Sequence, residues 1–240
     1  MKAYAATHVG NVRRNNEDDY YAPKGNEMFA IVADGMGGHN AGEVASKMAV
    51  DAVSSALRES EAVSEGALIH GVKRANHLIY EEGQRNPARR GMGTTVTAVW
   101  LDSAQALVAQ VGDSRAYLLR NGALMQITSD HSLVNEMVSR GEITPEAALT
   151  HPHRNIITRT VGTSADVTPD IFPVPRAQGD IWLLCSDGLS NFVQSHEMAQ
   201  ILLSDGDWQA KVDALIQTAL RRGGSDNITC VVLTDEEASV

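Results

Sequence analysis

Short apolar runs alternate with polar turn signals along the chain, and they predict a protein built largely from β-strands. The runs have the length of single strands. Asp102-Ser103 and Asn121-Gly122 lie between neighbouring runs and are typical of the tight turns that join antiparallel strands. The predicted strands cover residues 3–8, 28–33, 94–101, 104–111, 115–119, 181–185 and 228–234.

Helical periodicity appears in two blocks, one in each half of the sequence. Apolar residues in both blocks recur every three or four positions, as on the buried face of an amphipathic helix. One pair of helices follows the first predicted strands, the other pair lies near the end of the chain, and further strands lie between them, so we expect an α+β fold in which sheets are covered by helices on both outer faces. The predicted helices cover residues 41–57, 64–83, 196–203 and 208–221.

The segment from residue 128 to residue 162 breaks this rhythm. It is polar, contains Pro145 and Pro152, and predicts short helices at 133–139 and after Pro145. Such a stretch between strands is more typical of a functional flap than of a linker. A chain of 240 residues, 43% of them hydrophobic, can form one large core. We therefore expect a single domain, 1–240, with an excursion around 130–160.

Acidic residues outnumber basic ones by 30 to 20, which gives a formal net charge of −10. A negative surface repels nucleic acid and anionic membranes, so we expect neither as a partner. No apolar run approaches the length of a membrane span, and Arg13-Arg14 lacks the hydrophobic stretch of a twin-arginine signal. Cys185 and Cys230 lie in apolar runs, which predicts buried free thiols in a reducing cytoplasm, with a disulfide as the alternative.

Aspartates beside glycines or asparagines at the ends of apolar runs are the main chemical signal in the sequence. A carboxylate at the tip of a buried strand contributes little to stability. Like charges brought together from distant parts of the chain repel one another unless a cation lies between them. Ligands that are all oxygens favour Mg²⁺ or Mn²⁺ over zinc. The segments are 16–18, 33–38, 185–188 and 224–227.

This pattern predicts a site for two metal ions. Asp34 can bridge both ions, and Gly35 lets its own backbone carbonyl approach one of them. Asp187 and Asp226 can each complete the ligands of one ion. Two ions bridged by a water make a hydroxide nucleophile near neutral pH and neutralise charge that develops on a phosphoryl group.

Residues near the N-terminus extend the predicted site. Glu17 and Asp18 are adjacent, so on an extended strand only one of them faces the site. Arg13 can hold two phosphate oxygens with its planar guanidinium. The prediction is phosphoester hydrolysis by direct attack of water, without a covalent enzyme intermediate.

Six short motifs give the sequence a family resemblance. In this order along the chain, they are similar to motifs of the bacterial branch of the metal-dependent, type 2C protein phosphatases. Any one motif alone is weak, but six in order are specific. They lie at 12–18, 33–39, 91–95, 111–115, 186–189 and 225–229.

The resemblance implies a four-layer α-β-β-α sandwich, in which two antiparallel sheets are flanked by helix pairs. It implies a protein-serine/threonine phosphatase that uses Mn²⁺ or Mg²⁺, with two core ions and a third, weaker one. It also implies that residues 130–134 begin the flap. By motif match, the core ligands are Asp34, the Gly35 carbonyl, Asp187 and Asp226, Asp18 acts largely through water, Arg13 clamps the phosphate and Asp113 helps to bind the third ion.

The sequence departs from the eukaryotic pattern at one position. Eukaryotic members carry a histidine directly after the Asp-Gly pair, where it serves as the acid for the leaving alkoxide. Met36 occupies this position and cannot donate a proton. We interpret His39 as the nearest candidate acid, and a water on the metal as its alternative.

Each site residue also has a structural interpretation. Asp34 and Asp113 can be turn residues, Asp187 a helix cap, and Asp226 part of an Asx-turn. Alternative functions are a scaffold that binds phosphorylated partners without turnover, a phosphatase dedicated to one regulatory protein, and hydrolysis of small phosphoesters. We expect phosphorylated protein substrates, an opposing Ser/Thr kinase, a monomer and a cytoplasmic location.

Overall fold

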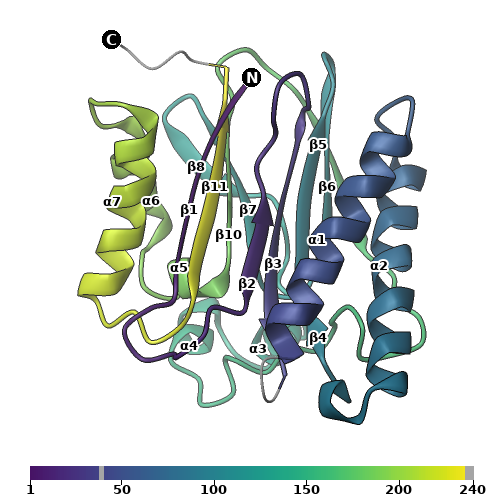
Figure 1. The fold of residues 1–240 in the computed structure, drawn as a ribbon. Helices are drawn as coiled ribbons and strands as arrows, with labels where there is room; N and C mark the ends of the chain where they lie inside the picture. Colours follow the sequence, from purple (N-terminus) through teal and green to yellow (C-terminus); the bar gives the residue numbers. More distant parts are fainter. Residues whose placement is uncertain (38–40, 236–240) are drawn as a thin grey trace.

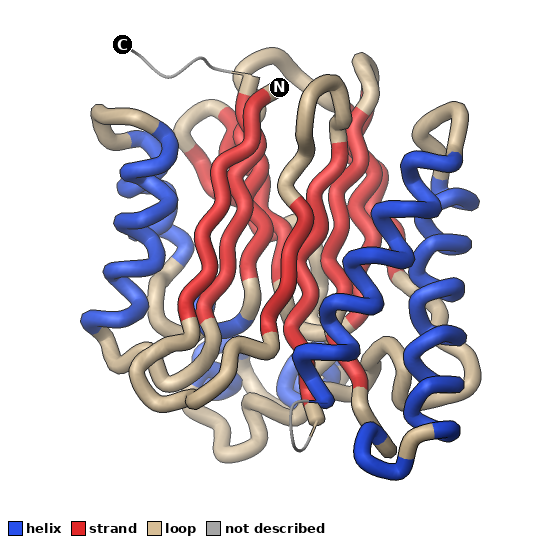
Figure 2. The backbone as a smooth tube through the Cα atoms, in the orientation of Figure 1, coloured by secondary structure: helices blue, strands red, loops and turns tan. Residues whose placement is uncertain are grey.

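In the computed structural model, which describes residues 1–37 and 41–235, two antiparallel sheets stack face to face between helices. The helices lie on the two outer sides and the strands fill the middle (Figure 1, Figure 2). The predicted α+β fold, a four-layer sandwich of two antiparallel sheets flanked by helix pairs, is confirmed.

The first sheet joins the two ends of the chain. Its strand order is β1-β11-β10-β7-β8, so the first and the last strand of the protein are neighbours. Every pair in it is antiparallel. The strands are β1 (Lys2–His8), β7 (Arg115–Arg120), β8 (Ala123–Gln126), β10 (Ile181–Cys185) and β11 (Ile228–Thr234).

The second sheet has the order β2-β3-β5-β6-β9, and a short strand, β4, pairs with the end of β3. These pairs are antiparallel as well. The strands are β2 (Asp18–Tyr21), β3 (Phe29–Met36), β4 (Gly93–Thr94), β5 (Val96–Leu101), β6 (Gln105–Val111) and β9 (Asp170–Pro175).

Helices cover the outer face of each sheet. The long pair α1 (Ala41–Glu59) and α2 (Glu65–Arg85) packs on the second sheet, and α6 (Ser195–Leu203) with α7 (Trp208–Arg221) packs on the first. Ser64 caps α2 and Asp207 caps α7, each by accepting a backbone N–H. The short helical turns η1 (Pro87–Arg89) and α5 (Asp187–Ser190) follow α2 and β10.

The central strands are apolar on both faces because each face is buried against a different layer. In β3, Phe29, Ile31 and Ala33 pack towards the helices, whereas Ala30 and Val32 pack against the other sheet. Successive side chains of a strand point to opposite faces, so a strand between two layers needs an apolar residue at every position. This explains why continuous apolar runs mark these strands in the sequence.

Three strands were not predicted. β2 has the polar sequence Asp-Asp-Tyr-Tyr, β8 lies at a sheet edge and is mostly exposed, and β9, also at an edge, contains Pro173 and Pro175. Edge strands tolerate proline and polar residues because one side of the ladder has no strand partner. The predicted strand 94–101 is interrupted at Thr95, which separates β4 from β5.

The excursion lies between β8 and β9. It contains the two predicted short helices, α3 (Leu133–Ser139) and α4 (Pro145–Leu149), which Ser132 and Thr144 cap. His131 ties the beginning of the excursion to the neighbouring strands. The Gly112 N–H donates to His131 Nδ1 at 3.1 Å, and His131 Nε2 lies 3.1 Å from Asp170 Oδ2. Because Nδ1 accepts this hydrogen bond and so carries no proton, Nε2 is assigned the ring proton and donates to Asp170.

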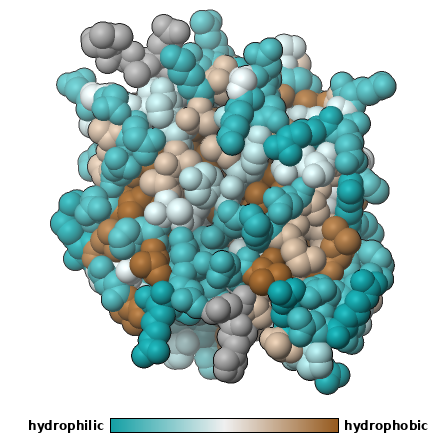
Figure 3. Space-filling model, in the orientation of Figure 1, coloured by the Kyte–Doolittle hydropathy of each residue, from teal (hydrophilic) through white to brown (hydrophobic). Residues whose placement is uncertain are grey.

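The surface of the molecule is mainly polar. On the face drawn in Figure 3, hydrophilic residues predominate and hydrophobic ones form small separate groups. None of the helices in residues 1–37 and 41–235 has the length and apolar character that a membrane crossing requires.

Candidate functional site

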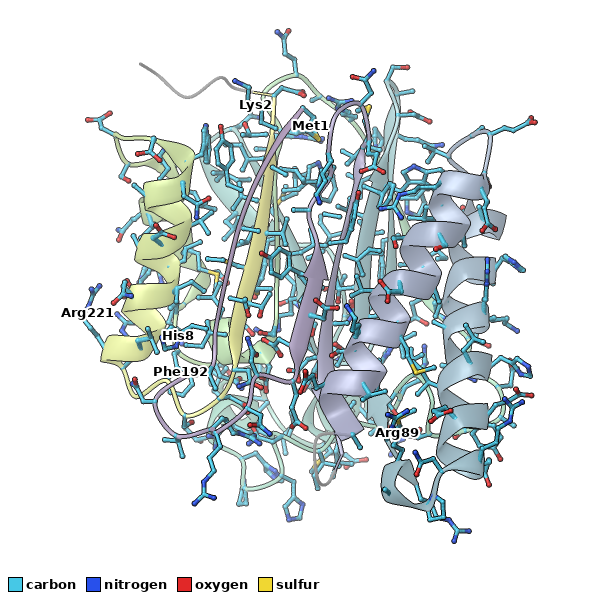
Figure 4. All side chains as sticks on the ribbon, viewed as in Figure 1. Met1, Lys2, His8, Arg89, Phe192 and Arg221 are labelled. Atoms are coloured by element: carbon cyan, nitrogen blue, oxygen red, sulfur yellow. The ribbon has the colours of Figure 1, made fainter. Side chains whose placement is uncertain are left out.

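The predicted site residues gather at one end of the sandwich. β3, β6 and β10 end there, and because the sheets are antiparallel, β2 and β11 begin there. His8, the last residue of β1, lies towards this end, whereas Met1 and Lys2 lie at the other end (Figure 4). Segments from both ends of the sequence thus reach the same place.

Asp34 has four other aspartates as neighbours, and we call the five together, Asp18, Asp34, Asp113, Asp187 and Asp226, the acidic cluster. Its pKa is raised well above the usual range, first by burial and then by repulsion from Asp18, Asp187, Asp113 and Asp226. The segments that carry these aspartates begin or end at the same end of the sandwich.

The backbone around Asp34 is held by two threonines. Asp34 N donates to Thr95 Oγ1 at 2.9 Å, and Thr94 Oγ1 donates to the Asp34 carbonyl at 2.9 Å. Thr95 is the residue that interrupts the predicted strand, and its backbone N–H also donates to the Asp34 carbonyl at 2.9 Å. These bonds satisfy the backbone of Asp34 and leave its carboxylate to the acidic cluster.

Asp18 is the register partner of Asp34 across β2 and β3. Ser186 Oγ donates to Asp18 Oδ2 at 2.8 Å, whereas the buried Oδ1 has no hydrogen-bond partner among the described residues. Burial raises the pKa of Asp18 to about 7, although hydrogen bonds from Thr229 and Ser186 oppose the rise. Asp18 thus presents one unsatisfied oxygen to the acidic cluster.

Asp187 and Asp113 have unsatisfied oxygens as well. Asp187 begins α5, and its Oδ2 accepts from Asn191 Nδ2 at 3.0 Å, but its buried Oδ1 has no partner in the described part of the chain. Asp113 follows β6, is 8% exposed, and its Oδ1 is also unpartnered there. Burial and then neighbouring carboxylates raise the pKa of Asp187 to about 6 and that of Asp113 to about 7.

Asp226 is turned towards Arg13. Arg13 Nη2 lies 2.9 Å from Asp226 Oδ2, and the two side chains are 50% and 33% exposed. Asp226 Oδ1 accepts from the backbone N–H of Asn227 at 2.9 Å. The predicted phosphate clamp therefore lies beside the acidic cluster, at its solvent-facing side.

Gly35 occupies a position where no side chain fits. A Cβ there would lie 2.2 Å from the Gly42 carbonyl oxygen and 2.5 Å from the Glu17 carbonyl oxygen. Gly35 N donates to that Glu17 carbonyl at 3.1 Å. The glycine lets α1, the start of β2 and the end of β3 approach closely, which brings its own backbone beside the acidic cluster.

The donor set fits a hard divalent cation. It consists of carboxylate oxygens, several of them buried and unpartnered, which Mg²⁺ and Mn²⁺ prefer. Among residues 1–37 and 41–235, however, no group of three or more His, Cys, Asp or Glu side chains is placed so that it could hold a metal ion. Asp226 Oδ2 is paired with Arg13.

One predicted site residue, His39, lies outside the described residues. Met36, whose thioether cannot donate a proton, ends β3. The sequence reasoning also missed two supporting residues. Asn227 Nδ2 donates to the carbonyls of Val9 and Asn15, and its Oδ1 accepts from Glu17 N. Ser186 holds Asp18. Both polar residues lie next to a predicted aspartate ligand in the sequence, and this position could have indicated their supporting role.

Comparisons with known proteins agree with this site. Residues 8–231 match the family described as Protein phosphatase 2C. The chain is 42% identical over 240 residues to the "Serine/threonine phosphatase stp" of Listeria welshimeri, covering 97% of this chain and 95% of the relative. The crystal structure of the Mycobacterium tuberculosis serine/threonine phosphatase PstP/Ppp has 39% identity and a TM-score of 0.89, with 96% and 97% of the two chains covered.

A further similar structure contains manganese. It is the catalytic domain of the serine threonine protein phosphatase PstP in complex with 2 manganese ions, with 38% identity, a TM-score of 0.87 and 96% of each chain covered. The predicted enzyme class, a protein-serine/threonine phosphatase, is confirmed by these similarities. The chain belongs to the protein phosphatase 2C family.

Proposed function

We propose that this protein removes phosphate from phosphoserine and phosphothreonine in proteins, with Mn²⁺ or Mg²⁺ held by the acidic cluster. The observation that carries the proposal is the convergence of buried, unpartnered carboxylate oxygens beside the half-exposed Arg13. The core ligands are Asp34, the Gly35 carbonyl, Asp187 and Asp226. Asp18 acts mainly through water.

The bound ions supply a hydroxide at neutral pH and neutralise charge on the phosphoryl group. The protein supplies position and electrostatics. Arg13 binds the phosphate oxygens with its guanidinium, at the side of the acidic cluster that faces solvent. Binding also places a dianion next to Asp226, so the Arg13–Asp226 ion pair must loosen as substrate enters. The water attacks phosphorus directly, and no covalent enzyme intermediate forms.

The proton for the leaving alkoxide has a candidate donor in His39, since Met36 cannot give one. Replacing His39 with Gln should lower the rate of hydrolysis of a phosphothreonine peptide more than that of an aryl phosphate, because an aryl leaving group needs no acid. Equal effects on both substrates would count against His39 as the acid.

The decisive assay is phosphate release from a phosphothreonine peptide with and without Mn²⁺. Asp187→Asn and Asp34→Asn should abolish release and weaken Mn²⁺ binding in calorimetry. Asp205→Asn, an exposed site on the loop after α6, makes the same chemical change away from the acidic cluster and should leave both unchanged. A folded protein that releases no phosphate with Mn²⁺ would contradict the proposal.

The finer parts of the prediction belong to the same proposal. Residues 1–240 form one catalytic domain in which the excursion acts as a flap, and Asp113 helps to hold a third, weaker ion. If so, Asp113→Asn should raise the Mn²⁺ concentration needed for half-maximal activity and leave two tightly bound ions in place. A third tight ion in that variant would contradict the assignment.

We also propose that the protein opposes a Ser/Thr kinase, as a monomer in the cytoplasm. Cys185 and Cys230 are buried free thiols although they are register partners on β10 and β11, which suits a reducing compartment. Size-exclusion chromatography should give the mass of one chain. A phosphoproteome comparison of a deletion strain with its parent should show phosphoserine and phosphothreonine accumulating on shared targets of one kinase.

A further inference from the structure

A cavity of about 270 Å³ opens beside the acidic cluster. The excursion forms one wall through α3 and α4, and the turn after α5 forms the opposite wall. Figure 1 shows α3, α4 and α5 gathered at this end of the sandwich. Asp113 and Asp187 border the cavity. A phosphorylated residue bound at the acidic cluster therefore has this space next to it.

Several polar groups that line the cavity are paired with one another. Arg115 Nη2 donates to Asp130 Oδ2 at 2.7 Å, and Arg115 Nε donates to Asp130 Oδ1 at 3.0 Å. Asn135 Nδ2 donates to the Asp130 carbonyl at 2.7 Å. Because these groups satisfy one another, they hold the wall in place and present no free charge to an incoming side chain.

Aliphatic residues lie among the polar residues of the walls. Val134 and Val138 lie on α3, Ala148 and Leu149 on α4, and the fully buried Val193 lies on the opposite wall. Leu149 is 65% exposed. A single exposed leucine is ordinary on a protein surface. Here, however, it belongs to a wall that continues into a cavity bordered by catalytic carboxylates.

We propose that this cavity is a subsite for an aliphatic or aromatic side chain adjacent to the phosphorylated residue of the substrate protein. The inference rests on the proposed function and names the substrates that it favours. The volume lies near the lower end of small-ligand sites, roughly 300–1,000 Å³, and has room for one leucine or phenylalanine side chain. Burying that side chain removes apolar surface from water.

The charges around the cavity are mixed. Asp113 and Asp187 border it, and the exposed Arg154 lines it as well. Arg115 is paired with Asp130. Neither sign of charge is therefore favoured throughout the cavity, and the aliphatic residues of its walls favour an apolar neighbour of the phosphorylated residue.

The test uses phosphothreonine peptides that differ only in the residue before or after the phosphothreonine. Leu, Ala, Lys and Asp are compared at each position with Mn²⁺ at saturation. At one of these two peptide positions, Leu should give about tenfold higher kcat/KM than Ala, because discrimination by a few methylenes in an apolar pocket has this size. Lys and Asp should both be poorer than Leu. A peptide series in which Lys is best would overturn the apolar assignment.

Variants locate the effect in the cavity. Leu149→Ser and Val138→Ser should each reduce the preference for Leu over Ala by about threefold. Leu203→Ser is the matched control: Leu203 is 55% exposed at the end of α6 and does not line the cavity, so the preference should persist. An equal loss of the Leu preference in Leu203→Ser would overturn the assignment of that preference to the cavity.

A small aryl phosphate separates this inference from the function on which it rests. p-Nitrophenyl phosphate has no neighbouring residue, so its Mn²⁺-dependent hydrolysis should be unchanged by Leu149→Ser. Equal rates for all peptides, with aryl phosphate hydrolysis intact, would overturn the subsite and leave the phosphatase function standing. No hydrolysis of any substrate by folded protein would overturn both.

Discussion

Stripping divalent ions from this protein should make its stability fall as the pH rises. Without metal, burial raises the pKa of Asp18 and of Asp113 to about 7, and that of Asp187 to about 6. An unfolded aspartate titrates near 3.9. Between about pH 4 and pH 7 the folded state therefore binds more protons than the unfolded state, so the stabilisation present at low pH is lost as the pH rises through the folded pKa values.

The size of the effect follows from the shift. Consider one carboxylate with a folded pKa of about 7. Between about pH 5 and pH 7 it is protonated in the folded state and ionised in the unfolded state, and each pH unit in this range lowers the free energy of unfolding by about 1.36 kcal/mol. Raising the pH from about 5 to about 8 therefore removes about 3 kcal/mol. Because the aspartates share the same repulsion, we expect a loss of this order for the acidic cluster as a whole. It is a large fraction of the roughly 5–15 kcal/mol that stabilises a typical domain.

Urea unfolding of chelator-treated protein at about pH 5, 6.5 and 8 measures this loss. Asp34→Asn is the matched variant, since it removes the central charge, and its stability should depend less on pH. His131 acts in the opposite sense, because burial lowers its pKa and its contribution is lost as the pH falls below about 6.5. His131 is present in both proteins, so the difference between their slopes excludes its effect.

In excess Mn²⁺ the free energy of unfolding should instead rise with pH, since ions held by ionised carboxylates are released as acid protonates those carboxylates. Metal-free protein that gains stability between about pH 5 and pH 8, or that has the same slope as Asp34→Asn, would refute the reasoning.

Three further changes test the geometry. Arg13→Lys should raise KM for a phosphopeptide by about tenfold while Mn²⁺ binding persists, because an ammonium cannot hold two phosphate oxygens in the same fork; unchanged steady-state kinetics would contradict the clamp. Asn227→Ala should lower the free energy of unfolding by about 2–4 kcal/mol, since it removes hydrogen bonds to three backbone groups near β2; urea unfolding in Mn²⁺ measures this, and a loss below about 0.5 kcal/mol would contradict it. Gly188→Ala should prevent folding, because a Cβ there would lie 1.9 Å from the Asn227 carbonyl oxygen; native circular dichroism would contradict that clash.

The sequence predicted the strands that both faces of the fold bury. β10 and β11 are buried throughout and mainly apolar, because helices cover one face and the other sheet covers the second. The edge strand β9 carries prolines, and β2 begins with Asp18, a predicted ligand, followed by another aspartate, so neither has the apolar pattern of a central strand. The strands that escaped prediction are those whose residues serve an edge or the site.

The sequence predicted which residues belong to the site, and it left their geometry open. Motif order indicated which aspartates converge, but the spacing of a motif leaves side-chain direction open. The ion pair between Asp226 and Arg13 depends on the loop before β2 reaching the start of β11. Asn227 fixes that approach through backbone groups, and hydrogen bonds to backbone leave no pattern of residue types in the partner segment.

The arrangement explains why a stable sandwich can support such a costly acidic cluster. Asp18 and Asp34 are register partners, so the ladder that joins β2 to β3 also forces two carboxylates together. The fold keeps these carboxylates close together without metal. It does so through the ladder, the threonines bonded to the backbone of Asp34 and the apolar layers on both sides of β3. Ions that enter therefore meet ligands whose mutual repulsion is already offset by the fold, and the free energy released by relieving that repulsion adds to metal affinity. On this argument, substitutions that weaken β2–β3 pairing lower metal affinity even where they touch no ligand.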